Sequence, residues 1–385
     1  MLLKRSIDVQ VDEYLQGQSY KTLFIWGPRR SGKTTLLKRL SKELNVPFFN
    51  FDYQSDRELF LPKREILEKL VSTHKVILID EVQNSPESTV ALKLLYDDFK
   101  VKVIATGSSE LRQKANQKFD TMAGRFIESY CLPLSIEEIA DNTPLVSYEK
   151  DSFFKELQAK LQIFGAYPEL YVQNKLSEAG KIDLLEKILD TYVLKDVIEI
   201  YDLKNEKLAR DILTKIALQL GSEVSIREIA VSLNANQITV SNYIEIFIKN
   251  YILIPLPSFR TNVRKAVSDN RKLYFYDLGI RNILVKDFRD LELRPDKGGV
   301  FENFIVSEIE KQRKNNKAKL SLYFYREYGG KEVDLIVEDY KKNYKAVEIK
   351  TTKGNVKNIF PLPSHREIIN AQNYFEKISA ITESN

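Results

Sequence analysis

The segment Gly27-Pro28-Arg29-Arg30-Ser31-Gly32-Lys33-Thr34 decides the fold of the amino-terminal part of the chain. It matches the pattern GxxxxGK[ST] and lies between an apolar run, residues 22–26, and an apolar-periodic stretch, residues 33–44. The glycines let the backbone curl so that successive amides point at a phosphate, and the following helix adds its positive end. Lys33 would reach the β- and γ-phosphates, and Thr34 would hold Mg²⁺. The nucleotide-binding residues are therefore predicted to be Gly27, Pro28, Arg29, Arg30, Ser31, Gly32, Lys33, Thr34 and Thr35.

A second part of this site is predicted by Val76-Ile77-Leu78-Ile79-Asp80-Glu81. The four apolar residues indicate a buried strand, and the two carboxylates follow at its carboxyl end, where ligands bind in open α/β sheets. We expect Asp80 to hold the water shell of Mg²⁺ and Glu81 to act as the base that polarises the attacking water. A further run, 101–105, ends in Thr106-Gly107-Ser108-Ser109. If it lies between the two previous strands, its hydroxyl groups, with Ser108 as the catalytic candidate, could orient that water.

Arg125 is the remaining catalytic candidate, because Met122-Ala123-Gly124-Arg125 precedes another apolar run. An arginine there could reach the γ-phosphate of its own site or that of a neighbouring subunit. A structural ion pair is the alternative, and the sequence leaves all three interpretations open.

Apolar runs alternate with helical patterns over residues 1–135, which predicts an α/β fold with a parallel sheet and crossover helices. The chain then reads as helix after helix over 136–204. Helices followed by a β-hairpin are expected over 205–290, and a helix with two or three strands over 291–385. The strands expected in the first region are 22–26, 47–51, 76–80, 101–106 and 126–132, and the clearest helices along the chain are 33–44, 86–99, 153–164 and 182–201.

These residues resemble the AAA+ superfamily of P-loop ATPases, in particular the bacterial and archaeal family that joins an ATPase core to a carboxyl-terminal domain of unknown function, DUF4143. The resemblance covers nearly the whole chain. It implies ATP and Mg²⁺ binding and ATP hydrolysis by a core over 1–135, with a helical lid over 136–204. It also implies a winged helix over 205–290 and a nuclease-like domain over 291–385. The motifs that carry it are Gly27–Thr34, Ile79–Gln83, Thr106–Ser109, Ala123–Arg125, Phe164–Glu169 and Tyr192–Asp196.

A helix–turn–helix is also indicated by the residues themselves. Ser225-Ile226-Arg227-Glu228 has the spacing of a capping box, and helical patterns follow over 226–233 and 237–249. Residues 205–276 hold ten Lys and Arg against six Asp and Glu, which hints at an anionic partner. A hairpin of 252–259 with 272–276 would form a basic wing, with Arg271 and Lys272 near its tip. Packing against protein is the alternative. The residues predicted to contact DNA are Gln237, Thr239, Ser241, Asn242, Arg260, Arg264 and Lys265.

Near the carboxyl end, residues 332–337 and 344–350 read as the two strands of a hairpin. An antiparallel register in which paired numbers sum to 682 sets Asp334 opposite Glu348, and Lys350 then shares that face. Two carboxylates and a lysine can bind a divalent cation and position a water. The arrangement resembles the PD-(D/E)xK nuclease superfamily, which implies Asp334, Glu348 and Glu302 as metal ligands and Lys350 as a catalytic residue. A solvated charged hairpin would give the same letters.

Composition narrows the function classes further. One cysteine, Cys131, excludes a disulfide scaffold, and two histidines far apart make a zinc enzyme a poor fit. The chain has no apolar run of bilayer length, and its first residues lack the apolar core of a signal peptide, so a cytoplasmic protein is expected.

We predict a cytoplasmic Mg²⁺-dependent ATPase that couples its nucleotide state to contact with DNA, through the winged helix and the nuclease-like domain. A homo-oligomer is compatible with this prediction, and no membrane partner is expected. Two alternatives stay open. One is a nucleotide switch that binds protein partners without DNA, and the other is a DNA nuclease regulated by ATP.

Overall fold

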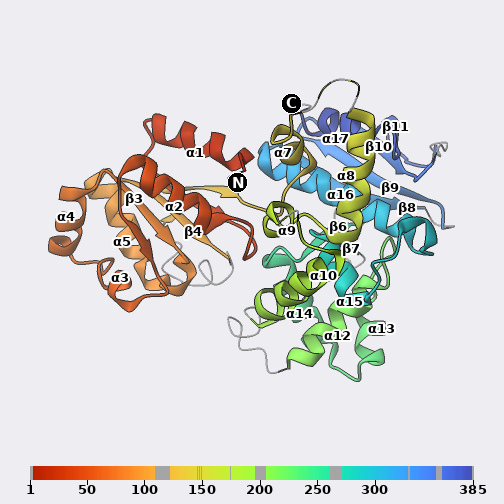
Figure 1. Cartoon of the computed structure of the whole chain (residues 1–385), viewed down its shortest axis with the longest axis horizontal. Helices are drawn as coiled ribbons and strands as arrows, with labels where there is room; N and C mark the ends of the chain where they lie inside the picture. Colours follow the sequence, from red (N-terminus) through yellow and green to blue (C-terminus); the bar gives the residue numbers. More distant parts are fainter. Residues whose placement is uncertain are drawn as a thin grey trace. The chain divides into compact units, whose positions relative to one another are not determined.

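The computed structural model describes residues 3–108, 122–144, 146, 148, 150–173, 175–195, 205–260, 271–327, 330–352 and 358–383. The chain divides into two compact units, Met1–Leu132 and Pro133–Asn385 (Figure 1). Among the residues that the structure describes, none of the helices combines the length and the apolar composition that a bilayer-spanning segment needs.

Five parallel strands form the sheet of the amino-terminal unit, in the order β2-β3-β4-β1-β5. β4 lies between β1 and β3, which is the condition set for the expected role of Ser108, so the carboxyl ends of these three strands meet at one edge. Every residue of β1 is buried, as expected for a strand covered on both faces. The strands are β1 (Thr22–Trp26), β2 (Phe48–Asn50), β3 (Val76–Asp80), β4 (Lys102–Gly107) and β5 (Phe126–Tyr130).

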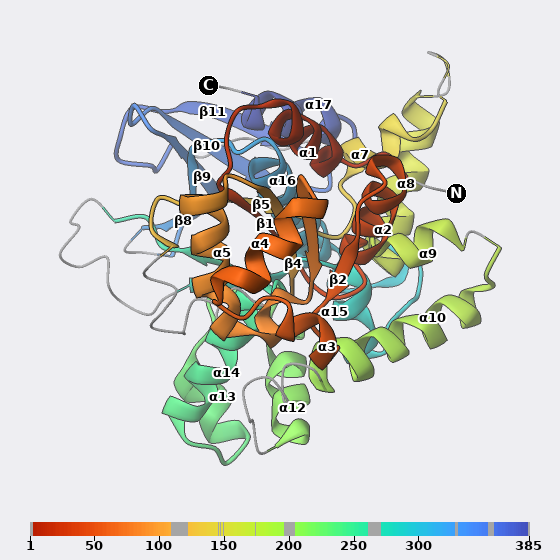
Figure 2. The ribbon, with the colours of Figure 1, turned by 90° about the vertical axis from the view of Figure 1, so that its left-hand side faces the viewer.

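Helices surround this sheet (Figure 2). Apolar side chains of α1 and α2 pack with those of the strands in one core, whose members include Leu37 of α2, Leu23 of β1 and Ile104 of β4. The helix predicted over 86–99 is broken into three short turns, because Pro86 starts a separate 3-10 turn and the last turn widens to a π-helix. The helical elements are α1 (Ser6–Gln16), α2 (Lys33–Leu44), α3 (Gln54–Glu58), α4 (Arg64–Thr73), η1 (Val82–Asn84), η2 (Pro86–Ser88), α5 (Thr89–Leu94) and η3 (Leu95–Phe99).

The carboxyl-terminal unit begins with helices, and one hydrophobic core joins them to the hairpin β6–β7. This core holds Tyr167 and Leu185 as well as Val240 and Phe275, so it includes side chains from both sides of residue 204, where the sequence analysis divides lid from winged helix. The elements are α7 (Ile136–Asp141), α8 (Lys150–Phe164), α9 (Pro168–Val172), α10 (Glu178–Lys187), η6 (Ile188–Lys195), α12 (Glu206–Ala217), α13 (Ile226–Ser232), α14 (Gln237–Lys249), β6 (Leu253–Pro257), β7 (Arg271–Phe275), α15 (Leu278–Val285) and η8 (Leu291–Leu293).

A four-stranded sheet follows, in the order β11-β10-β9-β8, with helices α16 (Lys297–Asn315) and α17 (Tyr374–Thr382). β9 and β10 pair in the register that was predicted, since Tyr344 lies opposite Glu338 and Val347 opposite Leu335, and both pairs sum to 682. β10 and β11 are parallel, whereas the other pairs are antiparallel. The strands are β8 (Leu320–Arg326), β9 (Glu332–Asp339), β10 (Tyr344–Ile349) and β11 (His365–Ile369).

The motif Phe164–Glu169 has a structural explanation within this unit. The buried carboxylate of Asp277 accepts hydrogen bonds from the Ala166 N–H (2.6 Å) and the Ile280 N–H (3.2 Å), so it both caps α15 and fixes the turn after α8. Gly165 adopts φ +76°, and a Cβ there would lie 2.1 Å from Asp277 Oδ1. The motif therefore positions α15.

Candidate functional site

The loop Gly27–Thr34 leaves the end of β1 and runs directly into α2. Its first glycine is required by close approach, because a Cβ on Gly27 would lie 1.9 Å from the carbonyl oxygen of Cys131. Lys33 Nζ lies inside the loop and donates hydrogen bonds of 2.8 Å to the carbonyl oxygens of both Gly27 and Pro28. Burial lowers the pKa of Lys33, and the neighbouring carboxylates of Glu81 and Asp80 oppose that shift.

Two side chains outside the motif hold the loop in place. Arg5 Nη1 donates to the Ser31 carbonyl oxygen (2.9 Å) and Arg5 Nη2 to that of Leu132 (2.7 Å), while Cys131 Sγ donates to the same Ser31 oxygen (3.3 Å). Arg5 was not predicted to take part, because an arginine just before an amphipathic helix looks like an ordinary surface charge. The loop conformation thus depends on a cation contributed from the start of α1.

Oxygen atoms suited to Mg²⁺ converge beside the loop. Thr34 Oγ1 donates to Asp80 Oδ2 (2.7 Å), and Thr106 Oγ1 donates to Asp80 Oδ1. Hydroxyl and carboxylate oxygens are the ligands that Mg²⁺ prefers. The Ser31 hydroxyl is fully buried and, among the residues that the structure describes, has no hydrogen-bond partner, which suits a group that meets a phosphate oxygen. The residues present therefore fit a Mg²⁺–nucleotide.

Glu81 and Ser108, the residues expected to act on the attacking water, are joined by Gln83, which was not among the predicted site residues. Gln83 Nε2 donates to Glu81 Oε2 and to Ser108 Oγ (3.0 Å), and the Ser108 N–H donates back to Gln83 Oε1 (3.3 Å). Glu81 itself adopts φ +53°, a left-handed conformation that is unusual for a non-glycine residue and that here directly follows β3. Gln83 is the last residue of the motif Ile79–Gln83, and its place in that motif was the one feature of the sequence that could have indicated a role in the site.

A known family model covers most of the amino-terminal unit and a few residues beyond it. Residues 19–140 match the family model described as an AAA domain. Together with the loop and the strand order, this match identifies the domain. Residues 19–140 form an AAA domain. Residues 155–292 and 297–370 match two families described as domains of unknown function, DUF8612 and DUF4143.

Relatives that match along most of the chain are described as uncharacterized proteins. One from Methanocaldococcus jannaschii is 26% identical over 335 residues, covering 82% of this chain and 72% of the relative. One from Haemophilus influenzae is 24% identical over 277 residues, covering 67% of each chain. Among solved structures, RuvB of Thermotoga maritima has a TM-score of 0.33 at 14% identity, covering 66% of this chain and 91% of RuvB. Aeropyrum pernix ORC1 in complex with DNA has a TM-score of 0.31 at 15% identity, covering 74% and 93%. These two scores are too low to support a conclusion about this chain.

Arg125 of the AAA domain does not reach the phosphates of its own loop, so that interpretation is wrong. Its carbonyl accepts a hydrogen bond from the Thr22 N–H (2.9 Å) at the start of β1, whereas the loop follows the other end of that strand. At ~3.3 Å per residue, the strand alone separates the two by roughly 16 Å. Arg125 Nε instead pairs with Asp97 Oδ1 at 2.8 Å, which is the structural ion pair that the sequence left open.

Of the residues predicted to contact DNA, four lie on α14 (Gln237, Thr239, Ser241 and Asn242), and Arg260 lies shortly after β6. Gln237 and Asn242 are exposed, whereas Thr239, Ser241 and Arg260 are partly buried. A cavity of about 610 Å³ beside α14 is lined by Gln237 and Ser241 but also by one arginine and two glutamates, so its charge does not favour phosphate. Ser109, Asp196, Arg264 and Lys265, which belong to the predicted motifs and contacts, lie outside the described residues.

The expectation of a basic wing is wrong for two of its residues. Arg271 pairs with Glu245 at 2.6 Å. Lys272 is only 1% exposed and pairs with Glu302 and Glu332, so it points into the protein. Both cations are neutralised within the chain.

The structure brings together the predicted Asp334, Glu348 and Lys350. Lys350 Nζ lies 3.0 Å from Glu348 Oε1 and 3.5 Å from Asp334 Oδ2, and the Ile349 N–H donates to Asp334 Oδ2 at 2.7 Å. Burial acts to lower the pKa of Lys350, but the two carboxylates outweigh it and the pKa is raised. Lys350 therefore stays a cation between two acids.

Glu302, the fourth predicted member, has other partners. Its Oε1 accepts from Lys272 Nζ (3.0 Å) and from the Tyr274 hydroxyl (2.5 Å). Carboxylate oxygens of Glu302, Glu332 and Asp334 all lie within 4.8 Å of one another. Burial raises the pKa of Glu302. The acidic group is thus compact, and it already holds a cation of the chain.

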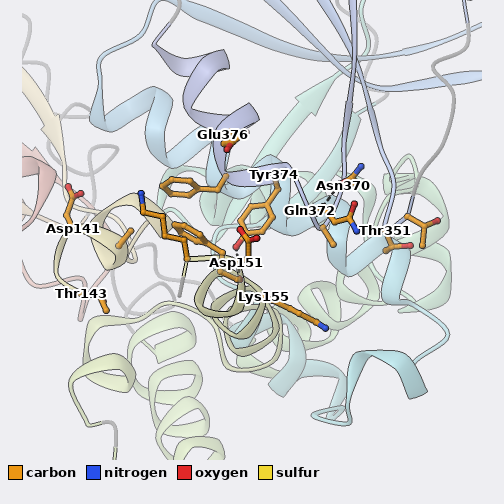
Figure 3. Close-up of a pocket in the computed structure, with 15 residues that line it drawn as sticks. Asp141, Thr143, Asp151, Lys155, Thr351, Asn370, Gln372, Tyr374 and Glu376 are labelled. Carbon is orange, nitrogen blue, oxygen red and sulfur yellow. Dashed lines mark hydrogen bonds between the residues drawn. The ribbon is translucent and has the colours of Figure 1, made fainter. Parts of the chain in front are cut away.

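A larger cavity of about 1150 Å³ opens in the carboxyl-terminal unit, beside the carboxyl ends of β10 and β11. The rings of Phe154 and Phe375 stack there with centroids 4.0 Å apart. Its lining includes two lysines among three carboxylates, which does not favour a polyanion. Figure 3 labels the lining residues Asp141, Thr143, Asp151, Lys155, Thr351, Asn370, Gln372, Tyr374 and Glu376.

Proposed function

We propose that the AAA domain binds ATP with Mg²⁺ and hydrolyses it. The observation that carries the proposal is the meeting of two hydrogen-bonded groups at one sheet edge beside the loop. One is Thr34–Asp80–Thr106 and the other is Glu81–Gln83–Ser108. The first has the donor set of a Mg²⁺ site, and the second joins a carboxylate base to a hydroxyl.

Each residue has a separate role in this proposal. The loop amides, the Ser31 hydroxyl and Lys33 bind the phosphates, and Thr34 and Asp80 hold Mg²⁺, which neutralises phosphate charge when bound. Glu81 accepts a proton from the attacking water, while Gln83 and Ser108 fix the direction of its carboxylate. A nucleotide-binding protein without hydrolysis would not need this second group.

Turnover and binding of ATP measured on the same variants test the proposal. Glu81→Gln should keep ATP affinity while turnover falls by roughly 10²–10⁴-fold, because only the proton acceptor is lost. Lys33→Ala should lose ATP binding itself. Glu65→Gln, an exposed acid on α4, is the matched control and should change neither quantity. Calorimetry that detects no heat with Mg²⁺ and ATP on folded wild-type protein would refute the proposal.

Contact with DNA that depends on the nucleotide state remains a prediction. It is supported by the exposed amides of Gln237 and Asn242 on α14, which follows α13 after the four-residue turn 233–236. The same two helices carry Val231 on α13 and Ile238 on α14, which are 73% and 71% exposed and would suit a protein partner instead. Binding to DNA and binding to a protein partner through apolar side chains should depend differently on the salt concentration.

ATP turnover alone, with duplex DNA and with single-stranded DNA separates these candidates. DNA contact predicts altered turnover and retention on duplex DNA that weakens steeply as salt rises. Gln237→Ala with Asn242→Ala should weaken retention, and Ile238→Ser should not. No retention at low salt would leave the nucleotide switch with a protein partner as the better interpretation.

A further inference from the structure

We infer that Lys272, and not a divalent metal ion, is the cation of the acidic cluster formed by Glu302, Glu332 and Asp334. Resemblance to the PD-(D/E)xK nucleases implies a metal ion held by Glu302, Asp334 and Glu348. The residues around this cluster do not fit that ion, because a side chain from β7 already supplies its charge.

The position of the Lys272 ammonium carries this inference. Its Nζ lies 3.0 Å from Glu302 Oε1 and pairs with Glu332 Oε1, and the side chain is only 1% exposed. The ring of Phe324 lies beneath it, with its centroid 5.5 Å from Nζ. The Tyr274 hydroxyl, from the same strand, donates to the Glu302 oxygen that also accepts from Lys272. One carboxylate oxygen of each of two acids is therefore directed at an ammonium.

Cations of the chain already pair with every carboxylate around the cluster. Arg326 Nη2 lies 2.6 Å from Glu332 Oε2, on the side of that carboxylate away from Lys272. Lys350 bridges Asp334 and Glu348, as described above. Three cations of the chain thus face these four carboxylates, and Arg326 also pairs through Nη1 with a fifth, that of Glu223, at 2.8 Å. A divalent ion bound by the same oxygens would displace Lys272, and a buried ammonium that has lost its partners is strongly unfavourable.

The cluster then has a structural role in place of a nucleolytic one. Lys272 lies on β7, Glu302 on α16 and Glu332 on β9, so its two ion pairs connect the hairpin after α14 to both layers of the nuclease-like domain. The wild-type chain should accordingly bind no metal through Asp334 and should not cleave DNA.

Binding of Mn²⁺ to the full chain, without nucleotide and followed by electron paramagnetic resonance, tests the inference. Wild type and Asp334→Asn should give the same binding curve, because Asp334 holds no metal ion in wild type and its replacement therefore removes none. Lys272→Met should bind one additional Mn²⁺, with a dissociation constant at least about tenfold lower than that of any weak binding to the cluster detected in wild type. Adding Asp334→Asn to Lys272→Met should abolish the gain, which places it at the cluster.

Two further variants control for charge and for folding. Lys297→Met removes an exposed lysine that also forms an ion pair, with Glu292 at 2.9 Å, and should gain no Mn²⁺. Lys272→Met with Glu332→Gln removes both partners of one pair and leaves Glu302, Asp334 and Glu348, so it tests the gain if the single variant fails to fold, as judged by circular dichroism.

Three results would overturn the inference. The first is a Mn²⁺ ion in wild type that Asp334→Asn removes, because metal and Lys272 would then share the cluster. The second is a folded Lys272→Met variant, single or double, that binds no more Mn²⁺ than wild type. The third is cleavage of plasmid DNA by wild type that Asp334→Ala or Lys350→Ala abolishes.

Discussion

Gln83 makes three hydrogen bonds at the centre of the proposed hydrolytic site, and a side chain without its amide group cannot make them. Gln83→Ala leaves Glu81 and Ser108 in the chain but removes the group that joins them. We expect kcat for ATP to fall about 10- to 100-fold with little change in KM, because orientation of the base is lost while phosphate binding is kept. Steady-state turnover measures both constants.

Asn84→Ala is the matched control for Gln83→Ala. Asn84 lies in the same short turn, η1, and its amide donates to the exposed Asp52 at 2.7 Å. Its removal should leave kcat unchanged. Equal losses of kcat in the two variants would show that the turn as a whole matters and that the link through Gln83 does not.

Arg125 gives a second prediction at the residue scale. Because it lies at the sheet edge opposite the loop, Arg125→Ala should leave turnover unchanged at concentrations where the chain is monomeric. A fall in turnover that appears only as concentration rises would indicate that the arginine acts on a neighbouring subunit. Loss of activity at every concentration would contradict the placement.

At the scale of elements, the turn between α8 and α9 is predicted to be unusually sensitive to a methyl group. Gly165→Ala combines a left-handed backbone with a Cβ 2.1 Å from the Asp277 carboxylate. Urea unfolding should show a loss of roughly 2–4 kcal/mol in the free energy of unfolding, the range of strain plus overpacking. The cap of α15 would be lost with it.

Two other glycines separate these causes. Gly330 has φ +86° with no described atom within 4 Å of a Cβ, so Gly330→Ala should cost only the backbone strain, about 1 kcal/mol. Gly180 lies in α10 with ordinary contacts of 3.4 Å or more, so Gly180→Ala should be neutral or stabilising by up to about 1 kcal/mol. The explanation fails if all three substitutions cost the same.

Elements with a strong local signal were predicted closely. β1, β3, α2 and α14 have the expected bounds, because each combines a clear apolar pattern with glycine, charged or capping residues at its ends. The register of β9 and β10 was also correct, since the short polar connection and the alternation along both strands leave few choices. The break at Leu95 within the helix expected over 86–99 has no such signal.

Residues that act across long sequence distances were not predicted. Arg5 and Lys272 each look like an ordinary surface cation, and their partners Ser31 and Glu302 are brought to them only by the tertiary fold. The assignment of Lys272 to a basic wing was wrong for this reason, because composition gives the number of charges and not the direction in which they point.

For the whole molecule, the division after Leu132 predicts two unfolding events. Calorimetry should show two transitions, and Mg²⁺ with ATP should raise the transition temperature only of the amino-terminal unit, which holds the loop Gly27–Thr34. At 100 times the dissociation constant the stabilisation is about 2.7 kcal/mol. Lys33→Ala should remove the shift without merging the transitions. A single transition that shifts as a whole would show that the two units unfold as one.

The buried ammonium of Lys272 also bears on how nucleases are recognised in sequence searches. A search that scores only the short D…ExK signature counts every chain of this kind among the DNA-cutting proteins, because the deciding side chain lies far upstream, in a strand that such a search does not read. Checking the residue aligned with position 272 would sort these sequences. Those with a lysine there would be set aside, and those with a small or neutral side chain would go first to cleavage assays.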